Sequence, residues 1–414
     1  MLEEKVVKLD SQLTMDRSFN RVDFQNTQLQ ASAANVIASG SISDLTTIMN
    51  TNIQGTWQPD WQRLKPLLDS MLGGLASIEG VQGGGFQMAG PIFNPNSDQP
   101  GQSWIHPNLQ VAANASWQGG AVLGMPIGGS NLDLQLRQGV AAVNTQPIQF
   151  GGGTVRLAPR LDLNSSEMVL FMPQGRVVDN IQLTQEICRG WMKYVAPMLA
   201  DATAAEGRFS IDAGNVQVPL SNLSAANVQG QAVLHGANVG PGPLSQQLIA
   251  VVAQVKALAK GQPLSAATAS GNSTWIRMPE QNVPFAVQQG RVHHQGMQFQ
   301  IDDVLIQTTG SVGLDQTMQM VAQIPILDSW VGTSRWTQGL RGQTLQIPIG
   351  GTVSKPQVDN RALQQMSQQL VQQAAGAAIN QEVQGQVQGL LDKGNQRLEE
   401  ELTKGLQGLF GGDR

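Results

Sequence analysis

The stretch Met318-Gln319-Met320-Val321-Ala322-Gln323-Ile324-Pro325-Ile326 decides the fold of this chain. Its apolar side chains recur at every second position, and successive side chains of a β-strand point to opposite faces of the sheet. The same alternation appears earlier, in 297–301, and later, in 345–349, just before the Gly350-Gly351 turn. These runs predict a β-sheet with one apolar face.

Strand-like alternation also covers most of the chain before residue 244. Leu9, Leu13 and Met15 alternate with polar residues near the N-terminus, and the leucines of 132–136 do so in the middle. Glycine clusters such as Gly151-Gly152-Gly153 separate the runs and are typical of turns. The pattern therefore predicts a β-rich α+β fold.

Four segments instead carry apolar residues at spacings of three and four, which is the pattern of an amphipathic helix. Trp57 and Trp61 open the first stripe, Thr184 is a suitable N-cap for the second, and Pro197 is placed to kink or end it. The predicted helices cover 60–72, 184–200, 244–260 and 361–409, the last being one helix or two joined near Gly394.

The order of these elements predicts groups of strands that are each closed by a helix. A short echo between 171–177 and 285–292, with Phe and Gly-Arg-Val in matching places, indicates a repeated unit, although chance similarity also explains it. The predicted units are 1–78 (strands and a short helix), 79–203 (strands closed by a helix), 204–358 (strands with the helix 244–260) and 359–414 (a helical tail).

Composition excludes several classes of protein. Charged residues make up only 13% of the 414 residues and the formal net charge is −5, so no basic field for nucleic acid is expected. Cys188 is the only cysteine, which excludes an internal disulfide, and its apolar setting predicts a packed side chain. The first residues show no signal peptide, and no apolar run approaches the roughly 20 residues of a membrane-spanning helix.

No enzyme or cofactor motif emerges from the sequence. Gly-x-Ser-x-Gly and the phosphate-binding loops are absent, and His293-His294 would point to opposite faces of a strand rather than to one metal ion. Asp302-Asp303 follows an apolar strand and is better explained as its polar end than as a pair of catalytic acids. We therefore expect no catalytic residues, no cofactor and no metal.

The region from Val283 onward resembles the C-terminal part of the AsmA-like family of bacterial envelope proteins, whose relatives include TamB and YhdP. The resemblance covers about 130 residues, and the matching segments are 285–290, 297–299, 310–314, 318–326, the Ile347-Pro348-Ile349-Gly350-Gly351-Thr352-Val353 turn, Lys355-Pro356 and the closing helix 361–410.

This resemblance implies an elongated, curved antiparallel sheet, in the form of an incomplete barrel or taco-like groove with an apolar inside and a long C-terminal helix. It implies a non-enzymatic protein of the bacterial cell envelope, placed in the periplasm, that binds or conducts phospholipid for outer-membrane lipid homeostasis or assembly. The family usually has an N-terminal membrane anchor, which this chain does not show. A misplaced start, a fragment, or a soluble form that reaches the membrane through a partner would each explain the difference.

An apolar sheet face must be covered by helices, by a second sheet or by an apolar ligand. The alternative is therefore a structural scaffold or assembly factor with a fully packed core, no lipid cargo, and an envelope protein partner bound by the C-terminal helix. Methionine suits a deformable binding surface but also fills cores. The candidate lipid-facing residues are Phe285, Val287, Met297, Phe299, Ile301, Met318, Met320, Ile324, Ile326, Leu345, Ile347 and Ile349.

Overall fold

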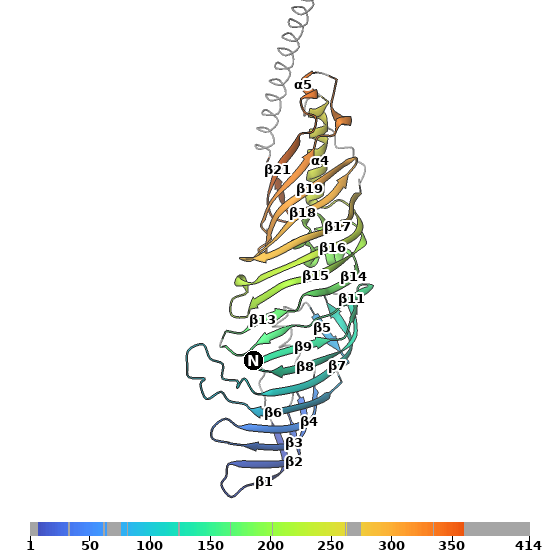
Figure 1. Ribbon diagram of the computed structural model, residues 1–414. Coiled ribbons are helices and arrows are strands. Elements are labelled where there is room, and N and C mark those ends of the chain that lie inside the picture. Colours follow the sequence, from blue (N-terminus) through green and yellow to red (C-terminus); the bar gives the residue numbers. More distant parts are fainter. Residues whose placement is uncertain are drawn as a thin grey trace, which may run out of the picture.

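The computed structural model describes residues 7–31, 34–60, 63, 76–80, 82–122, 125–165, 167–200, 202–260, 262, 275–333 and 335–359. Over these residues, 22 strands form one antiparallel sheet. Figure 1 shows an elongated molecule in which the strands are stacked largely in chain order, from β1 at one end to β21 near the other. The predicted β-rich fold with antiparallel strands is confirmed.

The first third of the chain forms a regular succession of strands. Neighbours along the sheet run β1-β2-β3-β4-β6-β7-β8-β9, and β5 pairs with the far end of β7. The bounds are β1 (Lys8–Met15), β2 (Arg21–Gln30), β3 (Ala34–Ser43), β4 (Asn50–Pro59), β5 (Ala76–Glu79), β6 (Gly84–Pro91), β7 (Gln110–Val122), β8 (Met125–Arg137) and β9 (Val140–Thr145).

The middle of the sheet divides into two branches that meet again. One branch runs from β8 through β9, β12 and β13 to β15, and the other runs from β8 through β10, β11 and β14 to β15. This gives the sheet a partly ring-like arrangement. The bounds are β10 (Ile148–Phe150), β11 (Gly153–Val155), β12 (Arg160–Asp162), β13 (Val169–Met172), β14 (Gly175–Gln182) and β15 (Ala205–Pro219).

From β15 onward each strand pairs with the next one in the chain as far as β22. The sheet thus continues across the boundaries predicted near residues 78 and 203, and the division into units stays a prediction. The bounds are β16 (Asn227–Val239), β17 (Ile276–Gln288), β18 (Arg291–Ile301), β19 (Val304–Gly313), β20 (Met318–Pro325), β21 (Thr344–Gly351) and β22 (Pro356–Val358).

The predicted helix over 184–200 is broken in the structure. Thr184 does cap its start, because its hydroxyl oxygen accepts a hydrogen bond from the Ile187 amide at 3.3 Å. Gly190 then leaves helical geometry, at φ −71° and ψ −112°, and Pro197 opens a separate turn. A single helix is therefore wrong here. The pieces are α2 (Gln185–Ile187), a π-helical turn (Cys188–Met192), α3 (Lys193–Val195) and a 3-10 turn (Pro197–Leu199).

The helix predicted over 244–260 is confirmed as α4 (Pro243–Ala259). Trp57, which was assigned to the stripe of the first predicted helix, instead belongs to β4, because alternation with Gln58 and Thr56 continues through it. The rest of the 60–72 helix falls almost entirely outside the described residues, and 361–409 falls wholly outside them. Short helical turns complete the described chain: Leu223–Ala225, Asp328–Trp330 and α5 (Arg335–Gln338).

The large hydrophobic core lies in the C-terminal half. The apolar sides of β15 to β21 pack against α4 and against the broken segment 185–199, and this cluster takes in only Met125 from the strands before β14 as a buried member. Figure 1 likewise shows α4 against the upper strands. Two helical elements thus cover one half of the sheet.

Candidate functional site

The structure places the candidate lipid-facing residues inside this core. Ten of them are buried, with no side chain more than 3% exposed, and Phe285 and Val287 are partly buried against the same cluster. They contact each other and the covering helices, so burial supports the packed-core alternative for this part of the sheet. The ten are Met297, Phe299, Ile301, Met318, Met320, Ile324, Ile326, Leu345, Ile347 and Ile349.

A polar clamp holds α4 in place over the core. The Trp330 indole nitrogen donates a hydrogen bond to Asp303 Oδ2 at 2.8 Å, and Lys256 of α4 lies 3.7 Å from Asp303 Oδ1. The Lys256 ammonium also sits over the Trp330 ring, 5.5 Å from its centroid. Asp302 and Asp303 form the two-residue turn between β18 and β19, as predicted for a polar strand end, and Asp303 ties that turn to the helix.

One histidine lies on the buried side of the sheet. His294 is buried, its Nε2 lies 3.4 Å from the Thr308 hydroxyl, and its Nδ1 has no hydrogen-bond partner. Burial, together with the nearby His293, lowers the pKa of His294 to about 4. The imidazole is therefore neutral at physiological pH. It is a polar group within the core that makes only one long hydrogen bond.

The N-terminal strands present a second apolar face that the described helices leave open. Cross-strand registers place its side chains on one side of β2 to β8. Most of them are only partly buried, whereas Leu136 and Ala115 on the same side are buried. At the edge strand β1, Leu9 and Leu13 are 64% and 61% exposed. We define the open apolar face as Leu29, Val36, Ile53, Trp57, Phe86, Met88, Val111, Leu132 and Leu134.

Two aromatic side chains of this face lie opposite glycines of the neighbouring strand: Phe86 is paired with Gly55, and Trp57 with Gly84. The Phe86 ring occupies the position that a Cβ at Gly55 would take, at 2.8 Å. The Trp57 indole reaches from β4 across Gly84 of β6, and its nitrogen donates to the Asn114 carbonyl on β7 at 3.1 Å. Pairing of an aromatic ring with a cross-strand glycine is a known device for stabilising sheets.

Two hollows lie along the sheet. One of about 590 Å³ is lined by three-residue runs of β3, β4, β6, β7 and β8, including Gln54, Gln87 and Asp133. A second hollow, of about 950 Å³, lies over β19 to β22 beside Gln319 and Gln346. Both are lined by a mixture of polar groups and apolar side chains.

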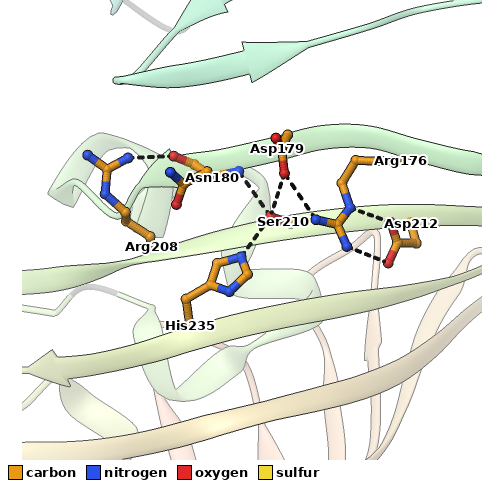
Figure 2. A network of polar contacts seen from close by, with 7 residues as sticks. All are labelled: Arg176, Asp179, Asn180, Arg208, Ser210, Asp212 and His235. Carbon is orange, nitrogen blue, oxygen red and sulfur yellow. Dashed lines mark hydrogen bonds and ion pairs between the residues drawn. The ribbon is translucent and has the colours of Figure 1, made fainter.

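A polar network joins β14, β15 and β16 where the two branches of the sheet meet (Figure 2). Arg176 donates to Asp212 at 3.1 Å and to Asp179 at 3.0 Å, and these contacts, Asp212 first, raise the pKa of the guanidinium. Arg208 Nη1 donates to the Asn180 carbonyl at 2.7 Å. The network thus links β14, the last strand of one branch, to β15 and β16.

Ser210 lies at the centre of the network, with its hydroxyl 2.8 Å from His235 Nε2 and 3.4 Å from Asp179 Oδ1 (Figure 2). A nucleophilic serine needs a base that a third group orients, and a surface open to substrate. Asp179 instead contacts the serine itself, and Ser210 is 0% exposed. The arrangement crosslinks strands and has no access for a substrate.

Other candidates of chemical interest resolve as packing. Cys188 is fully buried, and burial raises the pKa of its thiol to about 12, which keeps it protonated. Within the described residues, no group of three or more His, Cys, Asp and Glu side chains is arranged to hold a metal ion.

The sequence signal for the open apolar face was the alternation of apolar residues, in Leu9, Leu13 and Met15 and in 132–136. That signal did not show which half of the sheet the helices cover.

In the described part of the chain, no helix is both long and apolar enough to cross a membrane. Comparison of the chain with protein-family models, with curated proteins and with solved structures finds no match.

Proposed function

We propose that this chain is a non-enzymatic lipid-binding protein whose open apolar face holds the acyl chains of phospholipid. The observation that carries the proposal is the difference in burial between the two halves. Most apolar side chains on this side of β2 to β8 are only partly buried, although Leu136 and Ala115 are buried, whereas those of β15 to β21 are buried. The lipid surface therefore lies on the N-terminal strands and not on the C-terminal residues first considered.

The size and chemistry of the open apolar face suit acyl chains. Eight strands from β1 to β9, spaced about 4.8 Å apart, span roughly 34 Å, which is comparable to the hydrocarbon core of a bilayer at about 30 Å. Its members are aliphatic, aromatic or methionine side chains, and none of the nine is charged.

In this proposal the sheet acts as a curved, taco-like groove, and the packed C-terminal half is its rigid end. The resemblance of residues 283–358 to the AsmA-like family supports a place in the bacterial envelope, in the periplasm, with a role in outer-membrane lipid homeostasis. An envelope protein partner would engage the C-terminal segment.

A scaffold without lipid cargo is the second candidate function. It is favoured by one observation, that the strands most similar to the family carry their apolar side chains in a packed core. The two candidates differ in what they require of the open apolar face, since a scaffold needs no apolar ligand there.

Photo-crosslinking distinguishes these functions. A benzoylphenylalanine at Ile53, on the open apolar face, should crosslink to phospholipid when the protein is purified from a bacterial envelope or incubated with phosphatidylethanolamine vesicles. The matched control is the same probe at Gln54, which is adjacent on β4 but points to the polar face. Adducts at position 53 alone support lipid binding, whereas no adducts, or equal adducts at both positions, would contradict it.

A further inference from the structure

The edge of the sheet at β1 has the geometry to accept another strand. Within the described residues, β1 pairs with β2 alone. The Asp16 amide donates to the Arg21 carbonyl at 3.0 Å, which directs the even-numbered residues of this hairpin toward β2. The odd-numbered residues 9, 11, 13 and 15 therefore direct their N–H and C=O groups outward.

Strand β1 is regular along its length. The irregularity in its pairing comes from an extra residue in β2, where Asn26 adopts φ +47°. The alternation of inward and outward groups is consequently kept through the whole of β1, and a straight neighbouring strand could bond to all of its outward groups.

The side chains of β1 also lack cover. Leu9, Leu13 and Met15 are 64%, 61% and 50% exposed, and their partners Leu29, Phe24 and Val22 on β2 place them on the same side as the open apolar face. A long exposed edge with an apolar side is a template for pairing with a further strand. The edge therefore marks an interaction surface.

We propose that two copies of this chain pair antiparallel through β1, about a two-fold axis at Gln12. Because the outward N–H and C=O groups belong to odd-numbered residues, an odd-numbered residue of one copy must lie opposite an odd-numbered residue of the other. A two-fold axis also requires the two residue numbers of every pair to have the same sum, which is 24 when the axis is at Gln12. With the axis at Gln12, Lys8 lies opposite Asp16 of the second copy, twice by symmetry.

Neighbouring registers are less favourable in charge. An axis at Asp10 sets Asp10 against itself, and an axis at Leu13 sets Asp10 against Asp16 of the second copy, both of which are like-charge pairs. An axis at Ser11 pairs no charges. Asp16 is ionised, because hydrogen bonds from the Ser18 hydroxyl and the Arg21 amide lower its pKa, and its carboxylate keeps acceptor sites for Lys8.

The pairing would join two open apolar faces into one. Opposite residues of an antiparallel pair point to the same side, so Leu9 meets Met15 and Ser11 meets Leu13 across the axis. The two faces then form one surface of twice the length. This consequence for lipid rests on the proposed function, whereas the pairing itself does not.

A cysteine at the axis tests the register directly. At Gln12 the two copies form a non-hydrogen-bonded pair with Cα atoms about 4.5 Å apart, within the range for a disulfide. Gln12→Cys should therefore give a covalent dimer under mild oxidation, with Cys188 buried and uninvolved. The matched control, Thr14→Cys, places the two thiols about 13 Å apart along the strand and should remain monomeric on a denaturing gel.

Light scattering supplies the test without cysteines. The full chain should be a dimer, and Lys8→Glu, which turns both cross-copy attractions into repulsions, should weaken dimerisation by about tenfold or more. The pairing is overturned if the wild-type chain is monomeric and Gln12→Cys stays reduced, or if the two cysteine variants crosslink equally. Neither measurement uses lipid. A failure of the dimer proposal would therefore not affect the test of lipid binding by photo-crosslinking at Ile53.

Discussion

Strands β4 and β20 carry the same alternating pattern but differ in the burial of their apolar side chains. In β20 every second residue from Met318 to Ile324 is buried, and the residues between them, Gln319, Val321 and Gln323, are exposed or half-buried. In β4 the equivalent positions, Ile53 and Trp57, are only half-buried. Alternation thus determines which side chains share a face, whereas a second layer decides whether that face is a core or a surface.

The difference arises from where the helical segments fold back. Leu248 and Val252 of α4, and Ile187 and Leu199 of the broken segment, lie in the core cluster with the strands from β15 to β21. The described helices leave the apolar face of β2 to β8 without such a layer. An apolar sheet face in water is costly, at about 25 cal/mol per Å², which is why the proposed function assigns an apolar ligand to the half that the described helices do not cover.

The largest effect should come from a charge placed on each face. Ile324→Asp puts a carboxylate in a site with 0% exposure and should destabilise the protein by at least about 4 kcal/mol or prevent folding. Ile53→Asp should cost about 1 kcal/mol or less, while abolishing lipid crosslinking to its neighbours on the face. Urea denaturation measures both changes, and equal losses of stability would remove the distinction between the halves.

Replacing an aromatic side chain by alanine on each face should give a smaller difference in stability between the two faces. Phe299 is 0% exposed, and Phe299→Ala should cost about 3–5 kcal/mol through lost burial and a cavity. Phe86 is half-buried over Gly55, so Phe86→Ala should cost roughly 1–2 kcal/mol. The two losses are compared from the midpoints of urea denaturation, provided that the slope of unfolding free energy against urea concentration is unchanged. A larger loss for Phe86→Ala would indicate that the N-terminal face is packed in solution.

Acid should weaken the covered half through His294. Its folded pKa of about 4 lies below the unfolded value of about 6.5, so the unfolded chain takes up the proton first and stability falls as pH drops from about 6.5 toward 4. Between pH 7.5 and pH 5.0 the loss should be about 2 kcal/mol. His294→Gln should abolish that part of the dependence in parallel urea titrations, and an unchanged pH profile would contradict the assignment.

The clamp on α4 should contribute the least. The Lys256 and Asp303 side chains are 35% and 47% exposed and 3.7 Å apart, so solvent screens their attraction. Lys256→Met keeps the aliphatic contact with Trp330 and should change stability by less than about 1 kcal/mol. A loss of several kcal/mol by thermal denaturation would show that the clamp, rather than apolar burial, keeps the C-terminal half covered.

Much of the local structure followed from residue patterns. The alternation at 318–326 predicted β20 and its apolar side, the spacing at 244–260 predicted α4, and Thr184 was identified as an N-cap. These predictions succeeded because they rest on side-chain periodicity and on a hydrogen bond between residues three apart. The break at Gly190 was missed, since a glycine within an apolar stripe does not by itself reveal a non-helical ψ.

The candidate site was less predictable than the fold. The runs within 297–349 and the N-terminal runs show the same alternation of apolar residues. The candidate lipid-facing residues were predicted in the C-terminal runs because the alternation is most regular there. The structure buries those runs beneath α4 and leaves Ile53, Trp57 and Phe86 only partly buried. No local pattern distinguishes the two, because cover depends on contacts between segments distant in sequence, such as Val255 with the strands beyond residue 276.

The sequence by itself determined that strands dominate, which side chains share each face, and where α4 begins and ends, because these properties depend on neighbours within a few residues. Only the tertiary structure decided that the two branches of the sheet meet at β15 and that the C-terminal face is a core. Within the described residues, it likewise left the N-terminal face and the β1 edge without a covering layer. These outcomes depend on where long-range segments pack, and the same alternating strand is stable either under a helix or beside an apolar ligand.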